Sequence, residues 1–328
     1  MKRHAILLII PYFGHWPEWM PLFIHSIRLN PEIDFLFYTD CDTEILNAPN
    51  VRFKKVSFDE YIRFVNRKLP FQFSPENAYK LCDLRPLFGE IHKEDCADYA
   101  FYGWCDTDLL FGNLRAFYTP DILDRYDVIS SHAVRISGHL AIFRNNKRNR
   151  QRYEKIYRWR EALAEREFVG IDEHGLTNAY TWTIFDKINA KFGLAIDNFI
   201  TRSVKKRQIK RLYLVEKYTT PFTRIPWLDG TIDSMQPDTW YFKNGRIWND
   251  RDKATDFPYL HLMNFKSARW RHDKTPAPWE GKSSIYKVNE HMLNELIRIS
   301  PSGIETIDNW SESKKMTPTM QSQKGSNE

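Results

Sequence analysis

The sequence predicts an α/β protein whose N-terminal part is built on a parallel sheet. The chain opens with the order strand, loop, helix, strand, which is the start of a βαβ unit. A further apolar strand at 99–105 runs directly into two aspartates. Of the 328 residues, 42% are hydrophobic and 27% charged. This composition provides a full core and excludes a disordered or coiled-coil chain.

The N-terminal elements follow from their apolar patterns. His4–Ile10 is a short apolar run that predicts a buried strand. Apolar residues recur at helical spacing over Trp19–Ile27, and Pro31 ends that helix. Ile33–Tyr38 predicts a second strand, which ends at Thr39-Asp40. Because parallel strands bring their carboxyl ends to one edge, we expect ligands to bind there.

The middle of the chain continues this alternation of helices and strands. Ser74-Pro75 predicts a helix start, with Ser as N-cap, and Gly89 predicts its end. The next expected elements are the strands Tyr99–Cys105, Asp127–Ser130 and His139–Phe143, followed by a basic helix to about Glu167.

The C-terminal part has a different pattern. Trp240–Trp248 predicts a hairpin, because Asn244-Gly245 suits a type I′ turn. Tyr259–Phe265 predicts a strand. Apolar residues at helical spacing predict a C-terminal amphipathic helix, namely Ile285, Val288, Met292, Leu296 and Ile299. The tail 311–328 is almost without apolar residues and predicts disorder.

The net charge of +6 is concentrated in two basic runs, Arg144–Arg160 and Lys205–Arg211. Such runs bind anionic lipid, polyanionic glycan or nucleic acid, or form a solvated helix face. No nucleic-acid motif accompanies them, so no nucleic-acid partner is expected. The early apolar run Ala5–Ile10 is too short for a membrane span or a signal peptide. The four cysteines form no CxxC pair, so we expect a cytoplasmic protein with reduced thiols.

Asp106-Thr107-Asp108 is the most informative motif. The apolar strand before it delivers both carboxylates to the ligand edge of the sheet, while Thr107 points away or toward a nucleotide. Two close carboxylates repel each other, so they favour a cation between them. Oxygen ligands suit Mg²⁺ or Mn²⁺, which proteins bind together with substrate phosphates. The alternative is an Asx turn at a strand end.

Five segments together resemble a bacterial family of GT-A-type glycosyltransferases, largely uncharacterised and associated with capsule or lipopolysaccharide synthesis. They are IIPYFGHWPEW, FLFYTD, NAYKLCDLRPLFG, YGWCDTDLLFGNL and GHLAIFRN. The resemblance covers about residues 4–275. It implies an α/β GT-A fold, with a Rossmann-like mixed sheet flanked by helices and a C-terminal acceptor-side extension. The implied domain is 1–275, with a nucleotide-binding half at 1–130 and an acceptor-side half at 131–275; the C-terminal helix at 276–310 packs on it.

The resemblance also implies roles for single residues. The DxD aspartates bind a divalent metal and the sugar-nucleotide diphosphate. The residues that contact the nucleotide would be Pro11, Tyr12 and Phe13 in the first loop, Asp40, and Lys80, Asp83 and Arg85 on the helix that crosses the site. Gly112 and Asn113 would shape the metal loop. For Lys80 and Asp83 the alternative is an exposed i, i+3 ion pair.

Two later groups complete the expected site. In an inverting transfer one carboxylate takes the acceptor proton, and the resemblance assigns this to Asp172 or Glu173. The alternative is a helix start, with Asp172 as N-cap and Glu173 in the first turn. His261 would complete the metal shell and Lys266 would neutralise the leaving diphosphate, although a lone His in an apolar strand is more often a core residue.

Together these observations predict a glycosyltransferase that depends on Mn²⁺ or Mg²⁺. Its donor would be a nucleotide-diphosphate sugar and its acceptor a glycan or lipid-linked glycan in surface polysaccharide synthesis. The basic runs would give peripheral contact with the anionic inner face of the membrane. Two alternatives remain: a non-catalytic GT-A-like module that binds glycans, and a polyanion- or nucleic-acid-binding protein that uses the basic runs.

Overall fold

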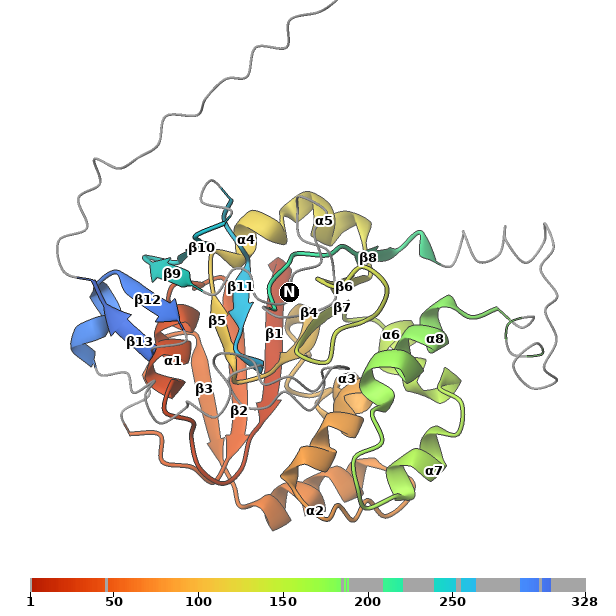
Figure 1. The fold of residues 1–328 in the computed structure, drawn as a ribbon. Helices are drawn as coiled ribbons and strands as arrows, with labels where there is room; N and C mark the ends of the chain where they lie inside the picture. Colours follow the sequence, from red (N-terminus) through yellow and green to blue (C-terminus); the bar gives the residue numbers. More distant parts are fainter. Residues whose placement is uncertain are drawn as a thin grey trace, which may run out of the picture.

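A seven-stranded mixed sheet forms the centre of the protein (Figure 1). The computed structural model describes residues 2–44, 47–183, 186, 188, 209–220, 239–251, 255–263, 290–300 and 303–307. The strand order is β3-β2-β1-β4-β7-β6-β8. Its parallel half consists of β3 (Val51–Lys55), β2 (Ile33–Thr39), β1 (Lys2–Pro11) and β4 (Tyr99–Cys105). β7 (Leu140–Arg144) is antiparallel to β4 and to β6 (Val128–Ser130), and β8 (Leu212–Leu214) is parallel to β6.

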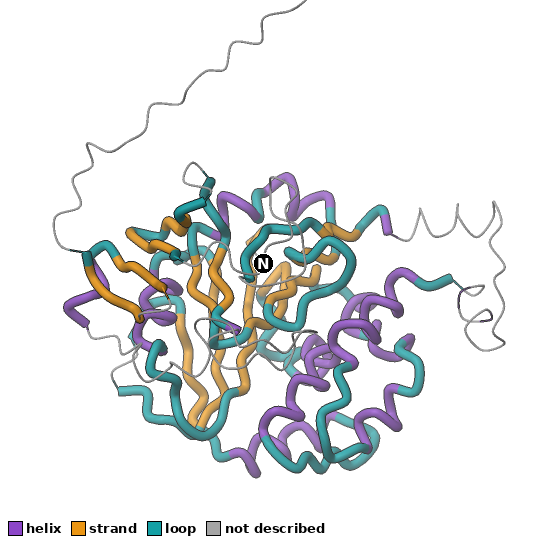
Figure 2. Tube along the Cα trace, viewed as in Figure 1, coloured by secondary structure: helices purple, strands orange, loops and turns teal. Residues whose placement is uncertain are grey.

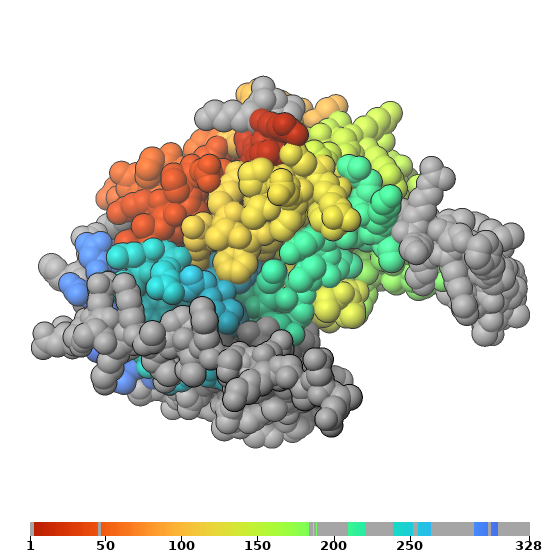
Figure 3. All heavy atoms as spheres, turned by 90° about the horizontal axis from the view of Figure 1, so that it is seen from above, coloured from red at the N-terminus to blue at the C-terminus, as the bar shows by residue number. Residues whose placement is uncertain are grey.

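Two smaller antiparallel sheets accompany it in the part of the chain that the structure describes. β5 (Leu109–Phe111) pairs with β11 (Tyr259–His261). The other has the order β10-β9-β12-β13, formed by β9 (Trp240–Lys243), β10 (Arg246–Asn249), β12 (Ile297–Ser300) and β13 (Gly303–Thr306). In the space-filling view, the green-teal residues 209–220 and the cyan residues near 260 adjoin the yellow middle part of the chain (Figure 3), which agrees with the pairing of β8 with β6 and of β11 with β5.

Short helices cover the sheet (Figure 2). The α-helices are α1 (Met20–Arg28), α2 (Phe58–Lys68), α3 (Phe88–Ile91), α4 (Leu114–Phe117), α5 (Pro120–Arg125), α6 (Lys147–Arg150), α7 (Trp159–Ala164) and α8 (Leu176–Thr181). The 3-10 helices are η1 (Ala78–Leu87), η2 (Arg152–Lys155) and η5 (Glu290–Asn294), and η3 (Ile171–Gly175) is one π-helical turn. None of the described helices is long and apolar enough to cross a membrane.

The middle of the central sheet is buried on both faces. Alternate residues of β1 point to opposite sides, because side chains along a strand have a period of two. Leu7 and Ile9 pack with residues of α2, η1, α3 and α8. Ile6 and Leu8 pack with residues of α1, β5 and α4. All four side chains are fully buried, which explains why this strand is a continuous apolar run in the sequence.

Most of the predicted strands are confirmed. The βαβ start, the strand 99–105 and the strands near 127–130 and 139–143 are present, and β11 covers the first part of the predicted 259–265 strand. The hairpin is also confirmed, because Asn244 and Gly245 both have positive φ, at 48° and 75°. Positive φ at both central residues is the requirement of a type I′ turn.

Three helix predictions are wrong in detail. The helix near residue 75 begins instead at Ala78, with Asn77 as its cap. Gly89 does not end it but lies inside α3, where a Cβ would come within 2.4 Å of the Tyr102 ring. The expected basic helix to Glu167 is three short pieces, α6, η2 and α7.

The C-terminal helix prediction is also wrong over the described residues. Residues 290–294 form the 3-10 helix η5, and Ile297–Ser300 form strand β12, which pairs with β9 and β13. Ile297 and Ile299 are two residues apart, so both point into the core of this sheet. Residues 276–289, the tail 311–328, Lys266 and Lys205–Gln208 lie outside the described residues.

Candidate functional site

The Asp106-Thr107-Asp108 motif forms the turn between β4 and β5. The Asp106 backbone N–H donates to the carbonyl oxygen of His139 at 2.9 Å, just before β7 begins. The Trp19 indole N–H donates to the Thr107 carbonyl oxygen at 3.0 Å. Because β4 is parallel to β1 and β2, the turn lies at the edge of the sheet where these strands end. This is the edge that the sequence predicted for a ligand.

Pairing of β11 with β5 brings His261 to this turn. His261 lies opposite Leu109, so its ring is beside Asp108, with Nε2 at 3.5 Å from Asp108 Oδ2. The Leu262 N–H donates to the Asp108 carbonyl oxygen at 2.7 Å. Gly112 permits this approach, because a Cβ there would lie 2.5 Å from the Phe257 carbonyl oxygen. Asn113 caps α4 rather than the turn.

Asp106, Asp108 and His261 form a group whose ligand atoms lie within 4.8 Å of one another and could hold a metal ion; it is called the metal group below. Two carboxylates and one imidazole are a donor set that suits Mn²⁺ or Mg²⁺. The other ring nitrogen of His261, Nδ1, is 3.0 Å from Thr220 Oγ1. Metal-binding histidines are commonly oriented by such a hydrogen bond on the second nitrogen. The residues present therefore fit a divalent metal.

His139 lies beside this group and was missed by the sequence analysis. Its ring stacks on the His261 ring with centroids 4.3 Å apart, and its Nε2 is 2.8 Å from the Tyr259 hydroxyl. Burial, and then the neighbouring His261, lower the pKa of His139 well below its usual value. A neutral His139 supports His261 without adding positive charge to the metal group. In the sequence it only begins a strand, so no local signal marks it.

Arg85 connects the metal group to a second acidic pair. Its guanidinium donates to Asp106 Oδ1 through Nη2 and to Asp172 Oδ2 through Nη1, the latter at 2.9 Å. Burial opposes the charge, but Asp106 and Asp172 are among the groups that hold the pKa of Arg85 above its usual value. η1 therefore carries a fixed cation between the two carboxylates.

Asp172 and Glu173 lie side by side in η3 but in different environments. Asp172 is 2% exposed, and burial, partly offset by Arg85, raises its pKa to about 6. The Glu173 side chain is 32% exposed; its Oε1 accepts from the Gly138 N–H at 3.0 Å, and its Oε2 is 3.3 Å from Arg135 Nε. The N-cap of η3 is Gly170, without a side-chain cap, so the interpretation of Asp172 as N-cap is wrong. Glu173 does lie in the first turn.

The chain matches a protein-family model. A sequence model of DUF6625, a family of unknown function, matches residues 8–292. The chain belongs to this family. No curated protein matches it.

Among solved structures, the chain is similar to the galactosyltransferase LgtC, whose structure was solved with donor and acceptor sugar analogues. The identity is 13%, the match covers 52% of this chain and 70% of LgtC, and the TM-score is 0.32. A likeness at this level does not decide the function.

The remaining predicted nucleotide contacts of this DUF6625 member lie in two places. Pro11 ends β1 at the ligand edge, Tyr12 and Phe13 lie in the loop that follows, and Asp40 Oδ1 accepts from the Gly14 N–H of this loop at 2.8 Å. By contrast, the side chains of Lys80 and Asp83 are fully buried and 3.0 Å apart. The exposed-pair alternative is therefore wrong, and neither side chain has surface with which to contact a nucleotide.

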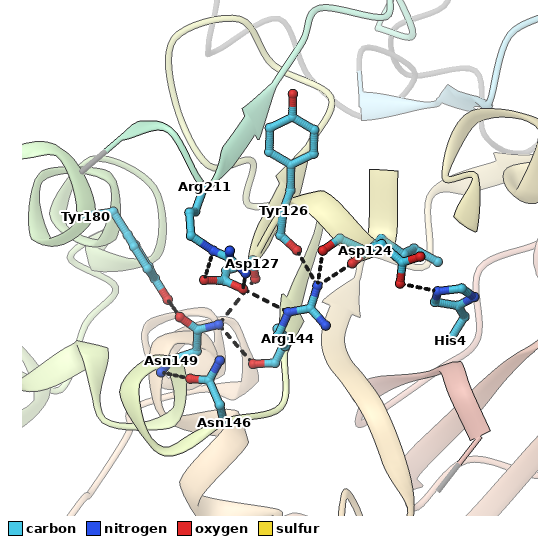
Figure 4. A network of polar contacts seen from close by, with 10 residues as sticks. His4, Asp124, Tyr126, Asp127, Arg144, Asn146, Asn149, Tyr180 and Arg211 are labelled. Atoms are coloured by element: carbon cyan, nitrogen blue, oxygen red, sulfur yellow. Dashed lines mark hydrogen bonds and ion pairs between the residues drawn. The ribbon is translucent and has the colours of Figure 1, made fainter. Parts of the chain in front are cut away.

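The basic runs contain cations that bind Asp127 and cations that are exposed. Arg144 and Arg211 bind the Asp127 carboxylate, with Nε–O distances of 2.8 and 2.7 Å, and tie β6, β7 and β8 together (Figure 4). The first run also carries exposed cations, namely Lys147, Arg148, Lys155, Arg158 and Arg160. Only the exposed residues are available to a partner.

Proposed function

We propose that this protein is a metal-dependent glycosyltransferase. It moves a sugar from a nucleotide-diphosphate sugar to a glycan or lipid-linked acceptor in bacterial surface polysaccharide synthesis. The observation that carries the proposal is the convergence of Asp106, Asp108 and His261 within 4.8 Å at the carboxyl edge of the parallel half of the sheet. The resemblance of the five quoted segments to GT-A glycosyltransferases supports the same reading.

The donor site is proposed around this group. Asp106, Asp108 and His261 would hold Mn²⁺ or Mg²⁺, which supplies positive charge to the diphosphate leaving group. Arg85, next to Asp106, adds a fixed cation at the same place. Asp40 and the loop Pro11–Phe13 would contact the nucleoside, while Thr107 lies in the turn between the two aspartates. Lys266 keeps its predicted role at the diphosphate as part of this proposal.

We assign the acceptor proton to Glu173 rather than to Asp172. A base must reach the hydroxyl that it deprotonates. The Glu173 side chain is about a third exposed, whereas Asp172 is almost fully buried and is held by Arg85. Asp172 orients the guanidinium between the two acidic groups. This assignment applies to an inverting transfer, which the anomeric configuration of the product reveals.

Replacing Glu173 with Gln tests this assignment. The amide keeps the size of the side chain but cannot accept the proton, so kcat should fall by about 10²- to 10⁴-fold. The donor Kd should stay the same, since Glu173 lies on the acceptor side. Glu165→Gln, at an exposed glutamate of the same region, is the control. Undiminished kcat in Glu173→Gln would exclude Glu173 as the base.

The donor class follows from a binding screen. Thermal unfolding is measured with UDP-, GDP-, dTDP- and CMP-sugars, each with and without Mn²⁺. A donor that binds the native state raises the unfolding temperature by mass action. We expect stabilisation by a nucleotide-diphosphate sugar only when Mn²⁺ is present, and none by the CMP-sugar, which lacks a diphosphate. No metal-dependent shift with any donor would contradict the proposal.

A cytoplasmic transferase with a lipid-linked acceptor must work at the inner face of the membrane. Each Lys or Arg near an anionic leaflet contributes about 1 kcal/mol, so the five exposed cations of residues 147–160 would attach the protein reversibly. Binding to anionic vesicles should weaken as salt rises. Replacing these five with Ser, while keeping Arg144 and Arg211, should release the protein. Wild-type protein that stays in the supernatant at low salt would identify the run as a solvated face.

A further inference from the structure

Lys80 and Asp83 form a buried ion pair on η1, the helix that also carries Arg85. Both side chains have no exposed surface, and Lys80 Nζ donates to Asp83 Oδ2 at 3.0 Å. Lys80 Nζ also donates to the carbonyl oxygen of Ala162 in α7 at 2.7 Å. A buried charge persists only where partners compensate it. The pair therefore has a function inside the protein.

The Asp83 carboxylate binds three consecutive backbone N–H groups of the segment that precedes Asp172. Val169 donates to Oδ2 at 2.8 Å, and Gly170 and Ile171 donate to Oδ1 at 2.8 and 3.0 Å. Gly170 has a φ of +88°, which turns these groups toward one point. Successive N–H groups in such a turn form a concave site for an anion. Here the bound anion is the Asp83 carboxylate.

η1 also holds Asp172, the residue that follows this segment, through the Asp172 side chain. Arg85, two positions after Asp83, donates to Asp172 Oδ2 at 2.9 Å and also binds Asp106. η1 thus fixes the segment 169–172 at two points, its backbone through Asp83 and its side chain through Arg85. Gly138 leaves little free space, because a Cβ there would lie 3.2 Å from both Asp172 Oδ2 and Glu173 Oε1.

We propose that Lys80 and Asp83 are positioning residues that clamp the 169–171 backbone and so set Asp172 and Glu173 against Arg85 and the metal group. This inference rests on the proposed glycosyl transfer at that site. It replaces the nucleotide contact that the resemblance implied for this pair. The two roles predict different losses, because a nucleotide contact acts on donor affinity and a positioning clamp acts on turnover.

The test removes both charges together, since removing one would leave the other buried and uncompensated. In Lys80→Met/Asp83→Asn, hydrogen exchange of the 169–171 amides should become at least about tenfold faster, because the carboxylate no longer holds them. The kcat should fall by about 10- to 100-fold, because small misplacements of reacting groups slow a reaction by about this factor. The donor Kd should change less than about twofold, since nothing that touches the donor is removed.

Two further variants make the outcome decisive. Gly170→Ala strains the same turn without touching the buried charges and should give the same pattern in milder form, even if the paired variant does not fold. Asp127→Asn, at another acidic residue held by two arginines, should lower stability but leave 169–171 exchange and kcat unchanged.

Unchanged exchange at 169–171 would overturn the clamp, as would a loss of donor affinity that equals the loss of kcat/KM. Exchange is measured on the protein without substrate. If the wild-type protein binds no nucleotide sugar, the proposed function fails, while faster exchange in the variants still supports the clamp.

Discussion

At the scale of single residues, burial separates side chains that look alike in the sequence. Asp172 and Glu173 are adjacent acids, yet one is almost fully buried beside Arg85 and the other is partly exposed. Lys80 and Asp83 have the spacing of a surface ion pair but no exposed surface. Residue type and spacing therefore predicted where charged residues cluster, but they could not predict which of these side chains are exposed.

The raised pKa of Asp172, about 6, predicts a pH-dependent effect of Asp172→Asn. Between about pH 4 and 6 the folded protein keeps a proton that the unfolded chain has already lost, so this group makes stability fall as pH rises through that window. Asparagine cannot ionise. Relative to wild type, Asp172→Asn should therefore gain about 2–3 kcal/mol of unfolding free energy between pH 4 and pH 7.

Urea unfolding at pH 4.5 and pH 7.5, with chelator present, measures this difference. The wild-type protein and the variant are compared at each pH, so that the pH dependence of all other groups cancels. A gap between them that is the same at both pH values would show that Asp172 titrates normally in the folded state.

At the scale of elements, the sequence predicted strands better than helices. A continuous apolar run such as Ile6–Ile10 favours a buried strand because it is too short for most helices and is followed by a turn. Leu296–Ile299 contains apolar residues that suit both a helix and a strand, and pairing with β9 decided in favour of the strand. A basic helix was predicted from the end of the strand at 139–143 to about Glu167, but the chain there is broken into α6, η2 and α7. Contacts between residues far apart in the sequence decided the structure of both segments.

The attachment of β8 to the sheet makes a second prediction. Arg211 donates two side-chain hydrogen bonds to Asp127, both at 2.7 Å, and its carbonyl oxygen accepts from the Asp127 N–H at 2.8 Å. Arg211→Ser removes the side-chain bonds while Arg144 still binds Asp127. Because Arg211 is half exposed, we expect a modest loss of about 1–2 kcal/mol in unfolding free energy.

Lys210→Ser is the matched control, since Lys210 is exposed in the same run. Denaturant unfolding of both variants gives the comparison. Equal stability of Arg211→Ser and Lys210→Ser would show that the Asp127 contacts do not fasten β8.

At the scale of the whole molecule, the site is assembled from distant parts of the chain. Asp106 and Asp108 could be predicted from sequence because a strand and its following turn are local. His261 reaches the turn only because β11 pairs with β5, and Asp172 reaches the site only through its contact with Arg85. Periodicity in the sequence reveals neither contact. The resemblance named these residues, and the structure shows how they meet. His139 was missed because its stacking on His261 is purely a long-range contact.

In the proposed site, Asp106, Asp108 and His261 bind the metal that a nucleotide diphosphate requires. The most direct measurement is calorimetric titration of the preferred nucleotide diphosphate into wild type, Asp108→Asn and Asp98→Asn, each with and without Mn²⁺. Asp98 is an exposed aspartate before β4 and serves as the control.

We expect Mn²⁺-dependent binding in wild type and Asp98→Asn. In Asp108→Asn it should be lost while circular dichroism shows an unchanged fold, because a neutral amide does not balance a divalent charge. The same Mn²⁺-dependent affinity in a folded Asp108→Asn variant would contradict the account.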